Sequence, residues 1–281
     1  MSEHIGLRGQ TWFAALTGRR EADLIQNPGD PKSVLSAEAR MGQDTGLFLC
    51  VTPNPESRFP CVRDGQVGLE EAYALAARVR RAMKEDRERS KSQKRPIIAI
   101  VDVKSQAYGR REETAGIFLA AAAAADAYAS ARIAGHPVIA LVAGHALSGG
   151  FLTHGYQANR ILAFDDAGVM IHAMHKEAAA RITRRSVADL ERLGHEIIPM
   201  SYDVRDFAKL GLLYKLLHAE DPLHPTPTEI DRVKQALVEA IDDARAGGTD
   251  LRHRFVSTEA RAARKAGIAV RTLMEAQWQE H

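Results

Sequence analysis

The stretch H-P-V-I-A-L-V-A-G-H-A-L-S-G-G, from His136 to Gly150, decides how this chain folds. It begins with a short apolar run, which is typical of a strand buried on both faces of a parallel sheet. The glycine pair at its end lets the chain turn tightly or approach a ligand closely, because glycine has no β-carbon. The stretch therefore predicts a strand, a turn and a helix, with a ligand site at the carboxyl end of the strand.

Units of the same kind are expected on both sides of this stretch. Five further strands are predicted, at Gly46–Thr52, Pro60–Val67, Pro96–Val103, Arg160–Phe164 and Gly168–His172. Three helices are predicted between them, at Leu69–Met83, at Glu112–Ala134 and from Gly150 to about Asn159. This alternation of strands and helices predicts an α/β fold of parallel βα units with right-handed crossovers.

The chain divides into three expected regions. Residues 1–45 are polar and are expected to form a loop-like N-terminal arm. Residues 46–220 contain the strand and helix pattern and form the expected core. Residues 221–281 read mainly as helix, which is typical of an element used for packing or assembly.

Composition excludes several classes of protein. No apolar run approaches the ~20 residues that a membrane helix needs, and the N-terminus lacks an apolar signal core, so we expect a cytoplasmic protein without a membrane partner. Cys50 and Cys61 lack metal-type spacing, so free thiols and no metal site are expected. The net charge is only +2, but basic residues concentrate at Arg78–Arg95 and Arg181–Arg185. Each run indicates a solvated face or a docking surface for an acidic partner; the absence of interleaved aromatic residues argues against nucleic acid.

Two loops that follow predicted buried strands form the candidate site. Gly149 and Gly150 begin a helix, whose free N–H groups would form an oxyanion hole or an anion site. The alternative role of these glycines is tight packing of the helix on the sheet. The earlier loop contains Gly109 with the cations Lys104 and Arg110, so both loops offer groups that bind negative charge.

The first loop and the start of its helix read V-D-V-K-S-Q-A-Y-G-R-R-E-E-T-A-G, from Val101 to Gly116. Together with the opening stretch, this motif resembles the carboxyltransferase branch of the crotonase/ClpP superfamily, and within that branch the gamma subunits of biotin-independent malonate decarboxylases. The resemblance covers about residues 45–220 and is closest in the two loops and in Y-D-V-R-D-F-A-K-L-G, from Tyr202. Lys104 and Ser105 stand where carboxyltransferases usually have proline and glycine, which argues against an ordinary biotin carboxyltransferase.

The resemblance implies a crotonase/ClpP-like spiral of βα units with a helical C-terminal region. It also implies that Gly109, with Gly149 or Gly150, donates N–H groups to one thioester oxygen. Such donors suit the loss of CO2 from a malonyl thioester, because the resulting enolate carries negative charge on that oxygen. The expected substrate contacts are Ser105, Gln106 and Arg110. A proton donor to the enolate carbon is also required, and the unranked candidates are Tyr108, His145, His154 and His172.

The implied activity is that of a carboxy-lyase subunit that converts a malonyl thioester to an acetyl thioester and CO2. In the resembled family the malonyl group arrives on an acyl carrier protein, through a phosphopantetheine-type prosthetic arm. The implied partners are a homologous beta subunit in a heterodimer, the acyl carrier protein subunit and an acyl-carrier transferase subunit. No directly bound cofactor, no biotin and no nucleic acid are expected.

Two other functions remain open at this stage. The order of Ser148 and His172 imitates the ClpP-type serine peptidases, with Asp165, Asp166 or Asp221 as the third group of a triad. The A-Y-G and E-E pattern of the first loop and the long helical tail argue against that peptidase or hydrolase, and Ser148 is then expected to be a helix cap. The second alternative is a non-catalytic scaffold subunit of a carboxyltransferase-type complex.

Overall fold

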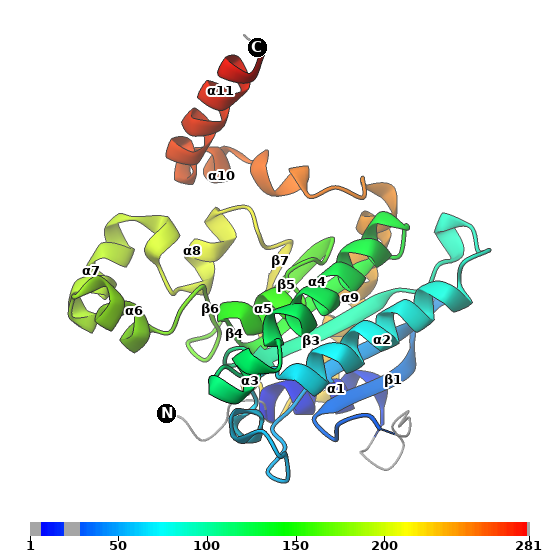
Figure 1. Ribbon diagram of the computed structural model, residues 1–281. Coiled ribbons are helices and arrows are strands. Elements are labelled where there is room, and N and C mark those ends of the chain that lie inside the picture. The colour runs from blue at the N-terminus through cyan, green and yellow to red at the C-terminus, as the bar shows by residue number, and fades with distance from the viewer. Residues whose placement is uncertain (1–6, 20–28, 280–281) are drawn as a thin grey trace.

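The computed structural model describes residues 7–19 and 29–279, and within them a single mixed sheet forms the centre of the molecule (Figure 1). Its strand order is β1-β2-β3-β4-β5-β7, and β6 pairs separately with β4. The β1–β2 pair is antiparallel and the other pairs are parallel. The strands are β1 (Val34–Met41), β2 (Asp44–Val51), β3 (Ile97–Val103), β4 (Val138–Leu147), β5 (Arg160–Phe164), β6 (Met170–His172) and β7 (Lys215–Leu217).

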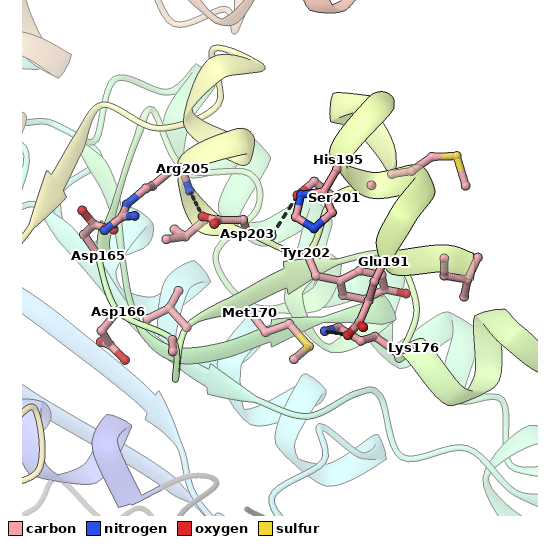
Figure 2. Close-up of a pocket in the computed structure, with 16 residues that line it drawn as sticks. Asp165, Asp166, Met170, Lys176, Glu191, His195, Ser201, Tyr202, Asp203 and Arg205 are labelled. Carbon is pink, nitrogen blue, oxygen red and sulfur yellow. Dashed lines mark hydrogen bonds and ion pairs between the residues drawn. The ribbon is translucent and has the colours of Figure 1, made fainter. Parts of the chain in front are cut away.

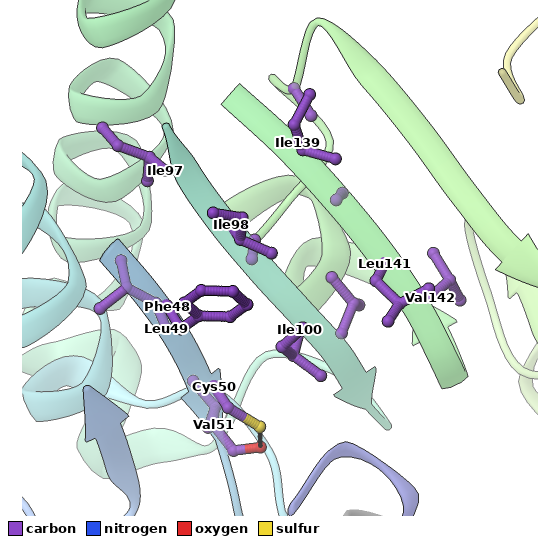
Figure 3. Close-up of a cluster of buried hydrophobic side chains, with 14 of the residues drawn as sticks. Phe48, Leu49, Cys50, Val51, Ile97, Ile98, Ile100, Ile139, Leu141 and Val142 are labelled. Carbon is purple, nitrogen blue, oxygen red and sulfur yellow. Dashed lines mark hydrogen bonds between the residues drawn. The ribbon is translucent and has the colours of Figure 1, made fainter. Parts of the chain in front are cut away.

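The central strands β3 and β4 pair in parallel from Ile97 opposite Val138 to Val101 opposite Val142. Every residue of β3 is buried, as the unbroken apolar run predicts for a strand covered on both faces. Side chains of β2, β3 and β4 fill the core between the helical layers (Figure 3). Strand β4 is long enough to pair with β5 along its first half and with β6 along its second half, so its ladder branches.

Helices cover both faces of the sheet. Helices α2 and α4 pack against each other on one face, whereas α1 and α9 pack on the other (Figure 1). The longer or core-covering helices are α1 (Leu7–Thr17), α2 (Leu69–Glu85), α4 (Ile117–Ile133), α5 (Ser148–Thr153) and α9 (Pro227–Ala246). The remaining α-helices are α3 (Arg110–Thr114), α6 (Lys176–Thr183), α7 (Val187–Glu196), α8 (Val204–Lys209), α10 (Thr258–Ala263) and α11 (Lys265–Gln279). No helix among the described residues is long and apolar enough to cross a membrane.

The predicted loop-like arm is wrong for two segments. Helix α1 buries Trp12, Phe13 and Leu16 against the sheet, and the rings of Trp12 and Phe164 lie 4.6 Å apart. Strand β1 pairs with β2 along its whole length. The few apolar side chains in these segments stand among polar residues, so the local sequence does not predict a helix or a strand. Contacts with distant parts of the folded chain bury them. The rest of the arm, residues 1–6 and 20–28, lies outside the described residues.

The predicted strand at Pro60–Val67 is also wrong, because this segment forms the 3-10 helix η2 (Pro60–Asp64). Proline suits the first turn of a helix, and Gly65 ends it with a φ of 80°, a left-handed conformation that favours glycine. The predicted helix Glu112–Ala134 is divided into α3 and α4 at Gly116, whose φ is 82°. The other predicted strands are present, and the helix after Gly150 ends early, at Thr153.

Candidate functional site

The loops after β3 and β4 meet at one edge of the sheet, because these parallel strands are neighbours. A β-carbon at Gly150 would lie 2.5 Å from the carbonyl oxygen of Ser105 and 3.1 Å from the backbone nitrogen of Gln106. Contacts that short to backbone atoms exclude any larger residue without movement of a loop. Gly150 therefore lets the two predicted loops touch, as expected for a site built from both.

The side chain of Gln106 connects the two loops. The backbone N–H of Gly149 donates a 2.8 Å hydrogen bond to the Gln106 Oε1 atom. The Ser105 hydroxyl donates to the same oxygen at 3.2 Å. Hydrogen bonds between Val67 and the backbone of Ser105 and Ala107 hold the first loop in place. An uncharged carbonyl oxygen thus lies in front of the Gly149 N–H, in a half-buried position.

An open cavity of about 650 Å³ lies beside Gly109. Gly109 precedes α3, and its backbone is extended, with a φ of 174°. The Tyr108 side chain is 56% exposed and lines the cavity. Burial, and then the nearby Glu112 carboxylate, raises the pKa of the Cys61 thiol above its ordinary value. The cavity lining is completed by Pro60, Cys61, Arg110, Arg111, Glu112, Thr114 and Ala115.

A second cavity, of about 440 Å³, lies between the sheet and helices α6 to α8 (Figure 2). Two ion pairs lie in its lining, Lys176 with Glu191 at 2.8 Å and Arg205 with Asp165 at 2.7 Å. Met170 is one of the apolar residues that line it. Asp165 and Asp166, two candidates for the third group of the serine triad, line this cavity, whereas none of the residues predicted as N–H donors, thioester contacts or proton donors does. The stretch beginning at Tyr202, which carries part of the family resemblance, also contributes to its lining.

A sequence model of the malonate decarboxylase gamma subunit matches residues 62–278 of the chain. The chain belongs to the malonate decarboxylase gamma-subunit family. It is also 34% identical to the malonyl-S-ACP:biotin-protein carboxyltransferase MADD of Malonomonas rubra over 202 residues, which are 72% of this chain and 69% of that protein. The predicted family and the predicted function as a malonate decarboxylase subunit are confirmed.

Solved structures support the same family at the level of the fold. A chain of a Pseudomonas malonate decarboxylase hetero-tetramer in complex with coenzyme A is 48% identical, with a TM-score of 0.88 over 96% of this chain and 99% of that one. A chain of the Pseudomonas hetero-dimer is also 48% identical, with a TM-score of 0.85 and the same coverage. A transcarboxylase 12S chain is 18% identical, with a TM-score of 0.58 over 78% of this chain and 36% of that one. The predicted crotonase-like α/β fold is confirmed.

In this gamma-subunit family member, Ser148 does not cap α5 as predicted. The N-cap residue is Leu147, and no side-chain cap hydrogen bond is present there. Ser148 is itself the first helical residue, with a φ of 56°. The left-handed conformation of a non-glycine residue costs about 1–2 kcal/mol. Ser148 therefore occupies a strained turn where β4 joins α5, and the predicted capping role is wrong.

The triad required by a ClpP-type peptidase is not assembled. The His172 ring lies 3.9 Å from the Tyr202 ring in a stacked arrangement, and its Nδ1 atom lies 3.0 Å from the Met174 carbonyl oxygen. Each predicted third carboxylate is engaged elsewhere: Asp165 with Arg205, Asp166 with Arg8, and Asp221 with His224. His172 therefore has the contacts of a structural side chain.

The other proton-donor candidates have different surroundings. His154 is fully buried, with its Nδ1 atom 2.9 Å from the Tyr128 hydroxyl and its Nε2 atom 2.9 Å from the Ile100 carbonyl oxygen. Burial lowers the pKa of His154 to about 4. His145 is half-buried, and burial, with the adjacent His175, lowers its pKa to about 4. These contacts favour a structural role for His154, whereas Tyr108 borders the cavity beside Gly109.

The two predicted basic runs also differ. In the first run, Arg78 pairs with Asp30, and Arg95 pairs with Glu38, Glu85 and Asp86. These two arginines are largely buried, whereas Arg81, which pairs with Glu85 at 2.8 Å, is exposed, so the interpretation of a paired, solvated face holds for only part of the run. In the second run the cations are exposed, and no ion pair joins them to a carboxylate in residues 7–19 and 29–279. The exposed cations of this run are Arg181, Arg184 and Arg185.

Both cysteines lie in the part of the chain that the structure describes. Cys50 and Cys61 are both free, as predicted. Across residues 7–19 and 29–279, no group of three or more histidine, cysteine or acidic side chains is arranged to hold a metal ion. The groups that the two loops do bring together are backbone N–H donors, a glutamine, a serine and the cavity with Tyr108 and Arg110.

Proposed function

We propose that this subunit, with a homologous beta subunit, decarboxylates a malonyl thioester carried by an acyl carrier protein, and that its two loops bind the thioester oxygen. The observation that carries the proposal is the 2.8 Å hydrogen bond from the Gly149 N–H to the Gln106 amide oxygen. A thioester oxygen resembles that amide oxygen in shape and hydrogen-bonding capacity. Gln106 then marks the position that the substrate oxygen takes when the glutamine side chain moves aside.

The chemistry requires donors of this kind. The bond between the carboxylate carbon and the α-carbon breaks, CO2 leaves, and the electron pair forms an enolate with charge on the thioester oxygen. A proton then arrives at the α-carbon and gives the acetyl thioester. N–H groups of Gly149, Gly150 and Gly109 held in place before the reaction stabilise the enolate more than the substrate, and one such donor contributes about 3–4 kcal/mol.

The cavity beside Gly109 supports the assignment of the remaining roles. Its lining joins the apolar surfaces of Pro60 and Tyr108 to the guanidinium of Arg110, which suits an acyl chain that ends in a carboxylate. Tyr108 is the predicted proton donor whose side chain lines this cavity. We assign Tyr108 the delivery of a proton to the enolate carbon. The Ser105 hydroxyl, and Gln106 after its side chain has moved away from Gly149, contact the thioester.

The relatives support the proposed partners. The Pseudomonas relatives crystallised as a hetero-dimer and a hetero-tetramer, one of them with coenzyme A, and the Malonomonas relative is named for malonyl-S-ACP. We propose a heterodimer with a beta subunit, with an acyl-carrier transferase subunit in the complex. The acidic carrier, with its phosphopantetheine-type arm, would dock at the exposed cations Arg181, Arg184 and Arg185. Independence from biotin stays a prediction, since the Malonomonas relative is named as a biotin-protein carboxyltransferase.

The test is Gly150→Ala in the assembled complex. The new β-carbon would lie 2.5 Å from the Ser105 carbonyl oxygen, so the loops must separate and the donors move. We expect the rate of CO2 release from malonyl carrier to fall about 100-fold or more, since donor placement controls the enolate. Gly248→Ala is the matched control, because its β-carbon would meet its nearest atom only at 3.8 Å.

Complex assembly and thermal unfolding are measured for both variants, so that a folding defect is recognised. Normal CO2 release from an assembled Gly150→Ala complex would contradict the proposed donors. Ser148→Ala is expected to retain activity within about threefold, because removal of its hydroxyl leaves the N–H donors in place. Complete loss of activity in Ser148→Ala would instead favour the serine hydrolase alternative.

A further inference from the structure

A buried carboxylate lies where β3 and β4 lead into the two site loops. Asp102, near the end of β3, is only 1% exposed. Its Oδ1 atom accepts a 3.0 Å hydrogen bond from the His145 backbone N–H, and its Oδ2 atom accepts a 3.1 Å hydrogen bond from the Gly9 backbone N–H. The carboxylate therefore joins β3, β4 and α1 at the edge of the sheet where the site is built.

The position of Asp102 coincides with an irregularity in the β3–β4 ladder. Val101 pairs with Val142, but Val103 pairs with Ala146, so Asp102 lies opposite three residues of β4. The extra residues of a bulge lose their ladder hydrogen bonds, and a buried backbone N–H without an acceptor is costly. The Asp102 carboxylate supplies the acceptor for the His145 N–H within this bulge.

Two glycines make room for this carboxylate. A β-carbon at Gly144 would lie 2.3 Å from the Asp102 Oδ1 atom, and one at Gly9 would lie 2.9 Å from the Asp102 β-carbon. Contacts that short exclude larger residues unless the carboxylate moves. Burial of a charged group also costs free energy, which an apolar side chain of similar size would not cost. The arrangement therefore serves the geometry of the strands better than it serves packing.

We propose that Asp102 is a positioning residue for the decarboxylation: it fixes β4 against β3 just before the two loops and so holds the Gly149 N–H where the thioester oxygen binds. This inference rests on the proposed function. Ser105 lies three residues after Asp102, and Ser148 lies three residues after His145. A displacement at the bulge therefore reaches the loops over very little chain. Misplacement of a reacting or stabilising group by about 1 Å can lower a rate about 100-fold.

This role has a kinetic signature. Asp102 acts through the backbone of β4 and not on the substrate itself. The enolate charge develops only as the transition state forms, so misplaced donors lower kcat more than they raise KM. A side chain needed only for folding would lower the amount of assembled complex and leave the kcat of each assembled complex unchanged.

The experiment measures CO2 release from malonyl carrier by the assembled complex, with kcat expressed per assembled complex. The variant is Asp102→Asn, which keeps the size of the side chain but places an NH2 group against one of the two N–H donors. The matched control is Asp86→Asn. Asp86 is also fully buried, and its Oδ2 atom accepts a 2.8 Å hydrogen bond from the Arg95 backbone N–H, just before β3 begins. The part of β3 from Ile97 to Asp102 spans about 16 Å at about 3.3 Å per residue, so the control lies far from the loops.

We expect Asp102→Asn to lower kcat at least about tenfold while KM stays within about threefold. Asp86→Asn should lower the melting temperature but change kcat less than about twofold, because it leaves the loops in place. If Asp102→Asn does not assemble, Asp102→Ser is measured in its place. Its single hydroxyl oxygen cannot reach both N–H groups, and it brings no NH2 group against them, so the same loss of kcat is expected.

Gly144→Ala gives a second measurement, because its β-carbon would push the carboxylate aside while Asp102 is retained. Its kcat should fall as well, and the double variant with Asp102→Asn should lose no more than the larger of the two single losses, since both changes break the same contact. Additive losses would show that the two residues act separately and would overturn the inference.

The remaining outcomes separate the inference from the proposed function. Normal kcat in an assembled Asp102 variant overturns the inference, while the proposed function still depends on Gly150→Ala. An equal fall of kcat in Asp86→Asn would assign the effect to lost stability and would also overturn the inference. Absence of CO2 release from the unsubstituted complex contradicts the proposed function, and the inference with it.

Discussion

The centre of the sheet and the lobe formed by α6, α7 and α8, residues 176–209, are packed very differently. In the centre, all residues of β3 are buried and the core continues through β2 and β4. The core of the lobe consists of Ala179, Ala180 and Leu190. Figure 1 shows the lobe projecting from the side of the sheet. The sheet is therefore rigid enough to fix the two site loops, whereas the lobe has little buried surface of its own.

The largest stability effect is expected in the sheet centre. Ile100→Ala removes a fully buried side chain of β3 and should lower the free energy of unfolding by about 3–4 kcal/mol, through lost burial and a residual cavity. Leu190→Ala in the lobe should cost only about 1–2 kcal/mol, because that small core can collapse onto the gap. Urea unfolding followed by circular dichroism measures both. If both variants lost the same free energy of unfolding, the lobe would be as tightly packed as the sheet.

A smaller effect should follow from pH. His154 packs against β3, and its pKa in the folded protein, about 4, lies below the ordinary value of 6.5 for an unfolded chain. The unfolded state therefore takes up a proton first as the pH falls. The stability contributed by neutral His154 is fully present above pH 6.5 and is lost between pH 6.5 and 4, by about 2–3 kcal/mol.

Unfolding curves at pH 7 and pH 4.5 test this effect. His154→Gln removes the titrating group while keeping hydrogen-bonding atoms near the Tyr128 hydroxyl and the Ile100 carbonyl. The variant should be less stable at pH 7 but lose less stability on acidification. The same pH dependence in the variant and the unsubstituted chain would assign the effect to other groups, such as His145.

The smallest effect is expected at the start of α7 in the lobe. The Ser186 hydroxyl accepts a 3.1 Å hydrogen bond from the Asp189 backbone N–H, and Asp189 completes the capping box. Ser186→Ala should cost about 1 kcal/mol. Because the lobe is thinly packed, the loss should appear as faster amide hydrogen exchange in α7 while the exchange of β3 stays unchanged. Faster exchange in both regions would mean that they unfold as one unit.

The same contrast explains how much of the fold could be predicted from the sequence. Strands β3 and β4 were predicted because burial on both faces demands an unbroken apolar run. Helix α1 was not predicted, because its buried Trp12 and Phe13 stand among polar residues. Their packing partners, such as Phe164 against Trp12, are distant in the sequence. The segment after Pro60 has the β-branched residues of a strand, but proline and Gly65 make a short 3-10 helix more favourable.

The site was predictable only in part. The glycines at 109, 149 and 150 stand out because each follows a buried strand at a helix start. The hydrogen bond between Gly149 and Gln106 joins residues far apart in the sequence, so no local sequence pattern predicts it. His154 was an equal candidate in the sequence, and only its position beneath α4, against Tyr128 and Ile100, shows that it is part of the core.

The branching of the β4 ladder has an evolutionary consequence. The first half of β4 pairs with β5 and the body of the sheet, whereas His145 to Leu147 pair with the three residues of β6, which lead into the lobe. Changes in the sequence or length of the lobe can therefore leave the pairing of Ile97–Val101 with Val138–Val142 unchanged. One scaffold can thus retain the two loops of the candidate site while the sequence and length of its lobe change.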